Sequence, residues 1–165
     1  MKTIRDYDQD GLKSIHNNEF MENDEFVSAY KRGIQAAGTD YNWHWRVHIG
    51  LWAARHCFHL EGDYVECGVN AGFMSSAIMH YLDWDGADRK FYLLDTFSGI
   101  DNKYITDEER VDGILEKNKD LLDNGFYIKD VDEVRKNFSQ WKNCKIIIGS
   151  IPDTLNEIKS KKVAF

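Results

Sequence analysis

The stretch Gly62-Asp63-Tyr64-Val65-Glu66-Cys67-Gly68-Val69-Asn70-Ala71-Gly72 decides the fold of this chain. It predicts a short buried strand that carries an acidic residue near its end and turns through two glycines into a helix. The helix is indicated by apolar residues at helical spacing in Phe73-Met74-Ser75-Ser76-Ala77-Ile78. Open α/β sheets bind ligands at the carboxyl ends of their strands, and glycine lets the backbone approach a ligand closely. The stretch therefore predicts a ligand site at this turn.

The spacing of the glycines narrows the class of ligand. Gly68 and Gly72 follow the pattern G-x-x-x-G, whereas a dinucleotide-binding turn follows G-x-G-x-x-G. Asn70 and Phe73 occupy the second and third glycine positions of that fingerprint. The turn thus indicates a nucleoside-type ligand without a pyrophosphate, with S-adenosylmethionine (SAM) as the leading candidate. An NAD-type oxidoreductase is the disfavoured alternative.

Length and charge exclude several classes of protein. The 165 residues suit one domain, and the net charge of −7, without a run rich in Lys or Arg, argues against a nucleic-acid partner. The longest apolar stretches are too short to cross a bilayer, and the first ten residues lack the apolar core of a signal peptide. The three cysteines have no metal-ligand spacing, and we expect reduced, partly buried thiols. These features predict a cytoplasmic protein without a membrane partner.

Strands alternate with helices along the chain. We expect helices at about 24–37, 42–60 and 73–82, and strands at 64–67, 91–94, 145–149 and from 163 to the last residue. This alternation predicts an α/β, Rossmann-like fold with helices flanking a parallel sheet, whose strands are ordered 3-2-1-4. The chain stops where the fourth strand opens, so the C-terminal strands of such a fold are expected to be missing.

The domain organisation follows from the same pattern. Residues 1–60 are expected to form an N-terminal helical cap, and residues 61–165 a partial SAM-binding domain. Within that domain, residues 101–137 are acidic and carry two helix-capping signatures, Thr106 with Glu109 and Asp130 with Glu133. Such a long connection after a ligand-binding strand predicts a helical lid.

Two carboxylates, Asp95 and Glu66, stand at the ends of predicted strands, where a ligand is expected to bind. Asp95 ends the second strand, where an acidic residue can accept hydrogen bonds from both ribose hydroxyls of an adenosine ligand. A turn carboxylate or helix cap is its structural alternative. Glu66 finishes a buried strand, which is costly for an unpaired charge. We therefore favour a ligand-facing role for Glu66 over a structural ion pair.

Three blocks together resemble the macrocin O-methyltransferase (TylF-like) family of class I SAM-dependent methyltransferases. They are Val65-Glu66-Cys67-Gly68-Val69 with Gly72, Leu94-Asp95-Thr96-Phe97-Ser98-Gly99-Ile100, and Gly149-Ser150-Ile151-Pro152-Asp153-Thr154-Leu155. The resemblance implies that Glu66, Gly68 and Gly72 line the methionine end of SAM. It also implies that Asp95 holds the ribose, that Thr96 and Phe97 lie beside the adenosine, and that Ser150 lies near the adenine.

The resemblance further implies methyl transfer to a hydroxyl of a sugar or another small metabolite, often with Mg²⁺. The metal carboxylates of the family follow the fourth strand, beyond Phe165, so no metal ligand and no catalytic base is assigned here. His44 and His48 stand four apart on a predicted helix, but packing of an aromatic-rich helix explains them better than a metal site. A non-catalytic SAM-binding or partner-binding fragment is the alternative function, and a homo-oligomer is possible.

Overall fold

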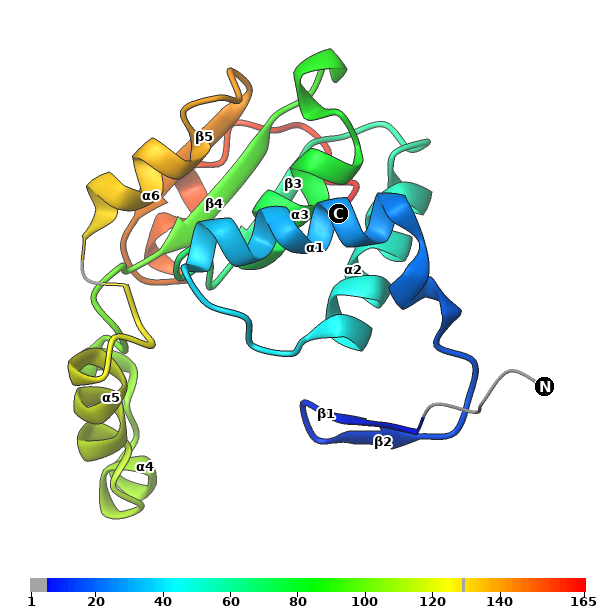
Figure 1. Cartoon of the computed structure of the whole chain (residues 1–165). Coiled ribbons are helices and arrows are strands. Elements are labelled where there is room, and N and C mark those ends of the chain that lie inside the picture. The colour runs from blue at the N-terminus through cyan, green and yellow to red at the C-terminus, as the bar shows by residue number, and fades with distance from the viewer. Residues whose placement is uncertain (1–5, 129) are drawn as a thin grey trace.

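The computed structural model describes residues 6–128 and 130–165. Within the described residues, three strands and two α-helices precede the glycine turn at residues 68–72, and the rest of the fold follows it (Figure 1). The elements are β1 Tyr7–Gln9, β2 Leu12–Ser14, α1 Asp24–Ala37, α2 His44–Cys57, β3 Tyr64–Cys67, α3 Phe73–Tyr81, β4 Phe91–Asp95, α4 Asp107–Val111, α5 Ile114–Asp123, α6 Val131–Phe138 and β5 Cys144–Ile148. Short 3-10 helices span Glu19–Glu22, Trp84–Gly86, Asn102–Tyr104 and Asp153–Glu157.

The sheet is parallel and has the predicted order. β4 lies between β3 and β5, with Tyr64 opposite Phe91 and Phe91 opposite Cys144. The last residues of the chain run along the free edge of β3, where Val163 forms a parallel bridge with Asp63. With that segment as the fourth strand, the order is 3-2-1-4, and the predicted α/β, Rossmann-like class is confirmed.

The two faces of the sheet carry different layers. Right-handed crossovers from β3 to β4 and from β4 to β5 place α3 and α6 on one face, where α1 and α2 add a second layer of helix (Figure 1). The main hydrophobic core lies there. The other face holds a small cluster of Tyr92, Leu94 and Ile147, against which Val65 and Ile158 pack. β4 is buried on both faces, which explains its continuous apolar run.

Glycines let the outer helices lie close to α3. A Cβ on Gly33 of α1 would stand 2.5 Å from the ring of Phe73, and one on Gly50 of α2 would stand 2.7 Å from Sδ of Met74. Glycine is unfavourable inside a helix, so its presence here reflects close packing. α1 spans the predicted residues 24–37: the Asn23 side chain accepts from the Phe26 N–H at its start, and Gly38 closes the helix with φ of 70°.

Several local expectations differ from the structure. The N-terminal part also contains the hairpin β1–β2, whose turn residues Asp10 and Gly11 both have positive φ. An Asp-Gly pair is a strong hairpin signal, and the sequence reading overlooked it. The helix after Thr106 breaks at Gly113 into α4 and α5, because Gly113 adopts φ of 75°. Cys67 is exposed rather than partly buried, because β3 loses its cover toward its carboxyl end.

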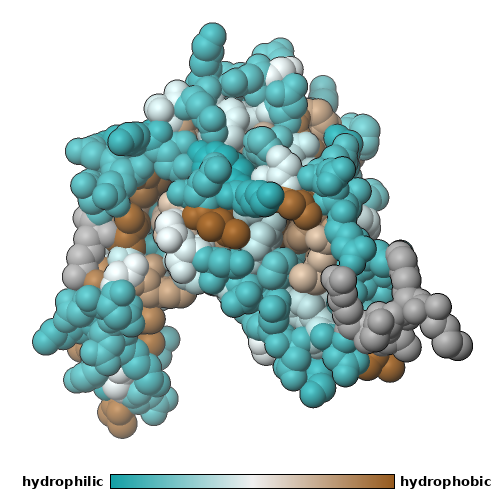
Figure 2. Space-filling model, in the orientation of Figure 1, coloured by the Kyte–Doolittle hydropathy of each residue, from teal (hydrophilic) through white to brown (hydrophobic). Residues whose placement is uncertain are grey.

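Two parts extend from the body of the molecule. The α4–α5 arm descends from the loop after β4, and the β1–β2 hairpin stands on the opposite side (Figure 1). Figure 2 shows a hollow between these two projections; hydrophilic residues cover much of this face, and hydrophobic patches border the hollow. α6, the last part of the expected lid, packs into the core through Val134 and Phe138 instead of joining the arm. In the described part of the chain, no helix has both the length and the apolar composition to cross a membrane.

Candidate functional site

Two adjoining cavities lie at the carboxyl ends of the strands. The first has a volume of about 320 Å³ and is walled by the loops after β4 and β5 and by residues 127–128. The second, of about 200 Å³, lies between the start of α2, the end of β3 and the start of α3. Gly68 and Asn70 line both cavities. Together they form one elongated site, at the place where open α/β sheets bind ligands.

Gly68 stands at the junction of the two cavities. Its φ of 86° is disfavoured for residues with a side chain, and a Cβ built on it would meet no atom within 4 Å. Its N–H donates to the carbonyl of Leu94, at 2.8 Å, which fixes the turn on the end of β4. The open space over this glycine allows a bound molecule to lie against the backbone, as the sequence predicts.

Asp95 fastens the turn to the loop after β4. Its Oδ2 accepts from the Asn70 N–H at 2.7 Å, and its Oδ1 accepts from the Phe97 N–H at 2.8 Å. The Thr96 hydroxyl also lies 3.3 Å from Oδ1, whereas Oδ2 has a single donor. Since a carboxylate oxygen has two lone pairs, Oδ2 keeps capacity for a further donor from the first cavity. Asp95 therefore acts as a turn carboxylate, and this structural role leaves room for the predicted contact with a ligand.

Asn70 is a site residue that the sequence reading passed over. Its backbone has φ of 51°, its Nδ2 donates to the Phe126 carbonyl, and its Oδ1 accepts from the Ile128 N–H, both at 2.8 Å. One amide side chain therefore ties the glycine turn to the segment that returns from the arm. The signal available in the sequence was an Asn in a turn, since Asn tolerates positive φ better than other residues with a side chain.

The loop after β4 is held in a tight turn. The hydroxyl of Thr96 donates to the Gly99 carbonyl, and Phe97, which is 5% exposed, adopts φ of 50°. Phe97 lines the first cavity but also belongs to the main core. Asn118 on α5 accepts from the Ile100 N–H at 2.9 Å, so the arm supports this loop.

Ser150 lies on the rim of the first cavity, with its hydroxyl directed to Asp101. This hydrogen bond, with a second one from the Lys103 N–H, lowers the pKa of Asp101. Asp153 pairs with Lys103 and accepts from the Tyr104 hydroxyl at 2.6 Å. The loops after β4 and β5 are therefore joined across one side of the cavity.

Glu66 lines the second cavity, and its environment disfavours the charged form. Burial, followed by the nearby charge of Asp95, raises its pKa to about 8, although the Ser75 N–H partly opposes the shift. Its Oε2 is buried, and no described group donates to it. A buried carboxyl oxygen without a partner is costly, so the site is suited to a ligand that supplies a donor or a positive charge.

Gly72 lines neither cavity. A Cβ on it would stand 2.5 Å from the ring of Phe138 on α6, so its lack of a side chain serves helix packing. The other predicted positions, Glu66, Gly68, Asp95, Thr96, Phe97 and Ser150, all line one or both cavities.

We expect Gly72→Ala to lower the free energy of unfolding by about 2–4 kcal/mol, because strain at φ of 86° adds to the contact with Phe138. Gly113→Ala is the matched control. Its φ is 75°, but the nearest atom to a Cβ there is 3.7 Å away, so only the backbone cost of about 1 kcal/mol applies. Chemical denaturation measures both variants. Equal losses of unfolding free energy in Gly72→Ala and Gly113→Ala would show that Phe138 does not constrain Gly72.

The histidines of α2 take part in aromatic packing. His44 stacks on Tyr30 with ring centroids 4.3 Å apart, and His48 stacks on Phe20 at 4.0 Å. Burial lowers the pKa of both imidazoles. Across residues 6–128 and 130–165, no three His, Cys, Asp or Glu side chains come together as a possible metal site.

Comparison with known proteins supports the fold. No model of a protein family matches the chain, and no curated protein is similar to it in sequence. The solved structure of the O-methyltransferase NovP is similar to it, with a TM-score of 0.54 over 85% of this chain and 70% of that one, at 20% sequence identity. The likeness shows that the chain has the Rossmann-like fold found in a methyltransferase.

Proposed function

We propose that this protein is a SAM-dependent methyltransferase that acts on a hydroxyl of a sugar or another small metabolite. The observation that carries the proposal is the pair of cavities that meet over Gly68, with Asp95 beside one and Glu66 in the other. A nucleoside with an amino-acid tail matches that division. The fold shared with an O-methyltransferase adds support.

The first cavity suits the adenosine part. Asp95 lines it and can accept hydrogen bonds from ribose hydroxyls. Apolar and aromatic side chains line the rest of it, among them Ile100, Tyr104, Tyr127, Ile128 and Ile151. The second cavity suits the methionine part and the acceptor, because it combines Glu66 with the aromatic rings of Tyr41 and Trp43. In this arrangement the chain aligns the sulfonium methyl with the acceptor hydroxyl and excludes water.

The described residues do not fit a magnesium site. Of the carboxylates that line the cavities, Asp95 is engaged with two backbone N–H groups and Asp101 with Ser150 and Lys103. No step of the proposed reaction therefore uses a metal. The hydroxyl acceptor would reach the site from the hollow between the arm and the hairpin (Figure 2).

Isothermal titration calorimetry with SAM, S-adenosylhomocysteine and NADH tests the binding half of the proposal. We expect the two adenosyl ligands to bind and NADH not to bind, because the turn lacks the glycines that a pyrophosphate needs. Preferential binding of NADH would favour the oxidoreductase. Methyl transfer from labelled SAM to a panel of sugars and phenols then separates a catalyst from a non-catalytic SAM-binding protein.

We expect Gly68→Ala to weaken SAM binding by about tenfold or more, because its Cβ would enter the space at the junction of the cavities. Gly68 and Gly72 share φ of 86°, so the two alanine variants carry the same backbone cost. The folded Gly72→Ala protein should keep its affinity. Weakened binding in Gly72→Ala alone would place the ligand elsewhere.

A further inference from the structure

Arg46 is the basic side chain of the second cavity. Among the described residues that line the two cavities, no other Lys, Arg or His is present, whereas Glu66, Asp95 and Asp101 are acidic. Arg46 comes from the first turn of α2 and its guanidinium lies over the ring of Trp43, 4.8 Å from the centroid. The cavity thus holds one acidic and one basic group, the pair that a zwitterion requires.

The guanidinium is held by the N-terminal hairpin. Nε of Arg46 donates to Oδ2 of Asp10 at 2.9 Å, and Nη2 donates to Oδ1 at 2.7 Å. This is a bidentate pair, which fixes the plane of the guanidinium. It engages Nε and Nη2, and no hydrogen bond to a described residue engages Nη1. Arg46 therefore retains donors for a second carboxylate.

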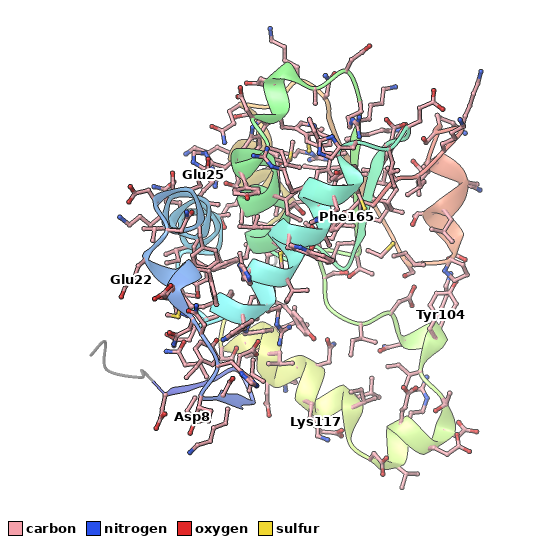
Figure 3. The ribbon with its side chains drawn as sticks, turned by 90° about the vertical axis from the view of Figure 1, so that its right-hand side faces the viewer. Asp8, Glu22, Glu25, Tyr104, Lys117 and Phe165 are labelled. Carbon is pink, nitrogen blue, oxygen red and sulfur yellow. The ribbon has the colours of Figure 1, made fainter. Side chains whose placement is uncertain are left out.

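The hairpin is itself anchored to the start of α2. Gln9 bonds to Nδ1 of His44 at 2.8 Å, and Tyr7 is 3% exposed with its hydroxyl 3.4 Å from the carbonyl of Asn42. The Asp10 side chain is only 19% exposed, although it lies in a turn. Figure 3 shows the hairpin, marked by Asp8, beneath the first turn of α2. The contacts place Asp10 in a fixed position relative to the cavity.

We propose that Arg46, oriented by Asp10 of the hairpin, binds the carboxylate of the amino-acid end of the ligand whose ammonium faces Glu66. The inference rests on the proposed function and adds to it: the β1–β2 hairpin becomes part of the site as a positioning element. It also predicts that Arg46 does not contribute to the affinity for ligands without an amino-acid end.

The test compares two ligands in calorimetry. S-adenosylhomocysteine carries the amino-acid end, and methylthioadenosine lacks it. For Arg46→Gln we expect the Kd of S-adenosylhomocysteine to rise about tenfold or more, and that of methylthioadenosine to change less than about twofold. Arg46→Lys should recover part of the loss, since it restores the charge without the bidentate geometry. Arg55→Gln, on the same helix but outside both cavities, should match the wild type.

Asp10→Asn tests the positioning role. It leaves the guanidinium in place but weakens its orientation, so the Kd of S-adenosylhomocysteine should rise by a smaller factor, again without an effect on methylthioadenosine. Equal weakening of both ligands by Arg46→Gln would show a merely structural role and overturn the inference. An unchanged Kd for S-adenosylhomocysteine would also overturn it. If the wild-type protein binds neither ligand, the proposed function fails and the inference falls with it.

Discussion

Replacing Glu66 by Gln is expected to remove a pH dependence from the stability of the ligand-free protein and to weaken SAM binding. Because the pKa of Glu66 is raised to about 8, the folded protein keeps a proton that the unfolded chain releases at the ordinary pKa of a glutamate. The free energy of unfolding therefore falls as the pH rises from the ordinary pKa of a glutamate to the raised pKa, and it levels off above about pH 8. Glutamine cannot ionise, so at about pH 9 the variant should be more stable by about 2–4 kcal/mol.

Binding should change in the opposite direction. A ligand ammonium facing Glu66 would favour the charged carboxylate, and the neutral amide should lower the affinity for S-adenosylhomocysteine by about tenfold or more. Chemical denaturation at several pH values and calorimetry measure the two effects. Glu61→Gln is the control, since Glu61 is an exposed residue that pairs with Lys162 and lines neither cavity. A stability that depends on pH equally in the wild type and in Glu66→Gln would refute the assignment.

Asp95→Asn is expected to damage both the fold of the site and its affinity. The two carboxylate oxygens accept from the N–H groups of Asn70 and Phe97, and an amide can accept only on its single oxygen. One buried donor loses its partner, which should lower the free energy of unfolding by about 1–3 kcal/mol. Loss of the charge-assisted acceptor should also weaken SAM binding by about tenfold or more.

Asp101→Asn is the matched control for Asp95→Asn. Asp101 also lines the first cavity, but its bonds go to Ser150 and Lys103 at the rim rather than to the glycine turn. We expect a small change in SAM affinity and almost none in stability. Thermal unfolding and calorimetry on both variants would separate the two positions. Equal effects at Asp95 and Asp101 would remove the special role of Asp95.

Local sequence patterns were sufficient to predict the main strands and helices of the fold. The strand–turn–helix from β3 to α3, the buried run of β4 and the ends of α1 at Asn23 and Gly38 were predicted close to their observed positions. The capping box of Thr106 with Glu109 is also present. Each of these depends on interactions within one turn of helix or on the burial of one strand, so each leaves a periodicity or a cap in the adjacent sequence.

The parallel strand order could be predicted for a related reason. Right-handed crossovers allow few arrangements of alternating strands and helices, and the sheet follows one of them. The convergence of Gly68, Asp95 and Ser150 then follows, because the carboxyl ends of parallel strands share one edge. To this extent the site was predictable from the sequence alone.

The tertiary structure decided the remaining roles, because they depend on partners far away along the chain. Gly72 is required by Phe138, and Asn70 binds the backbone at Phe126 and Ile128. Arg46 takes its orientation from Asp10 of the hairpin. No periodicity or motif records which distant side chain will meet a given residue, since such contacts form only when helices and loops pack on the sheet. The sequence determined at which edge of the sheet the cavities form, and packing determined which side chains surround them.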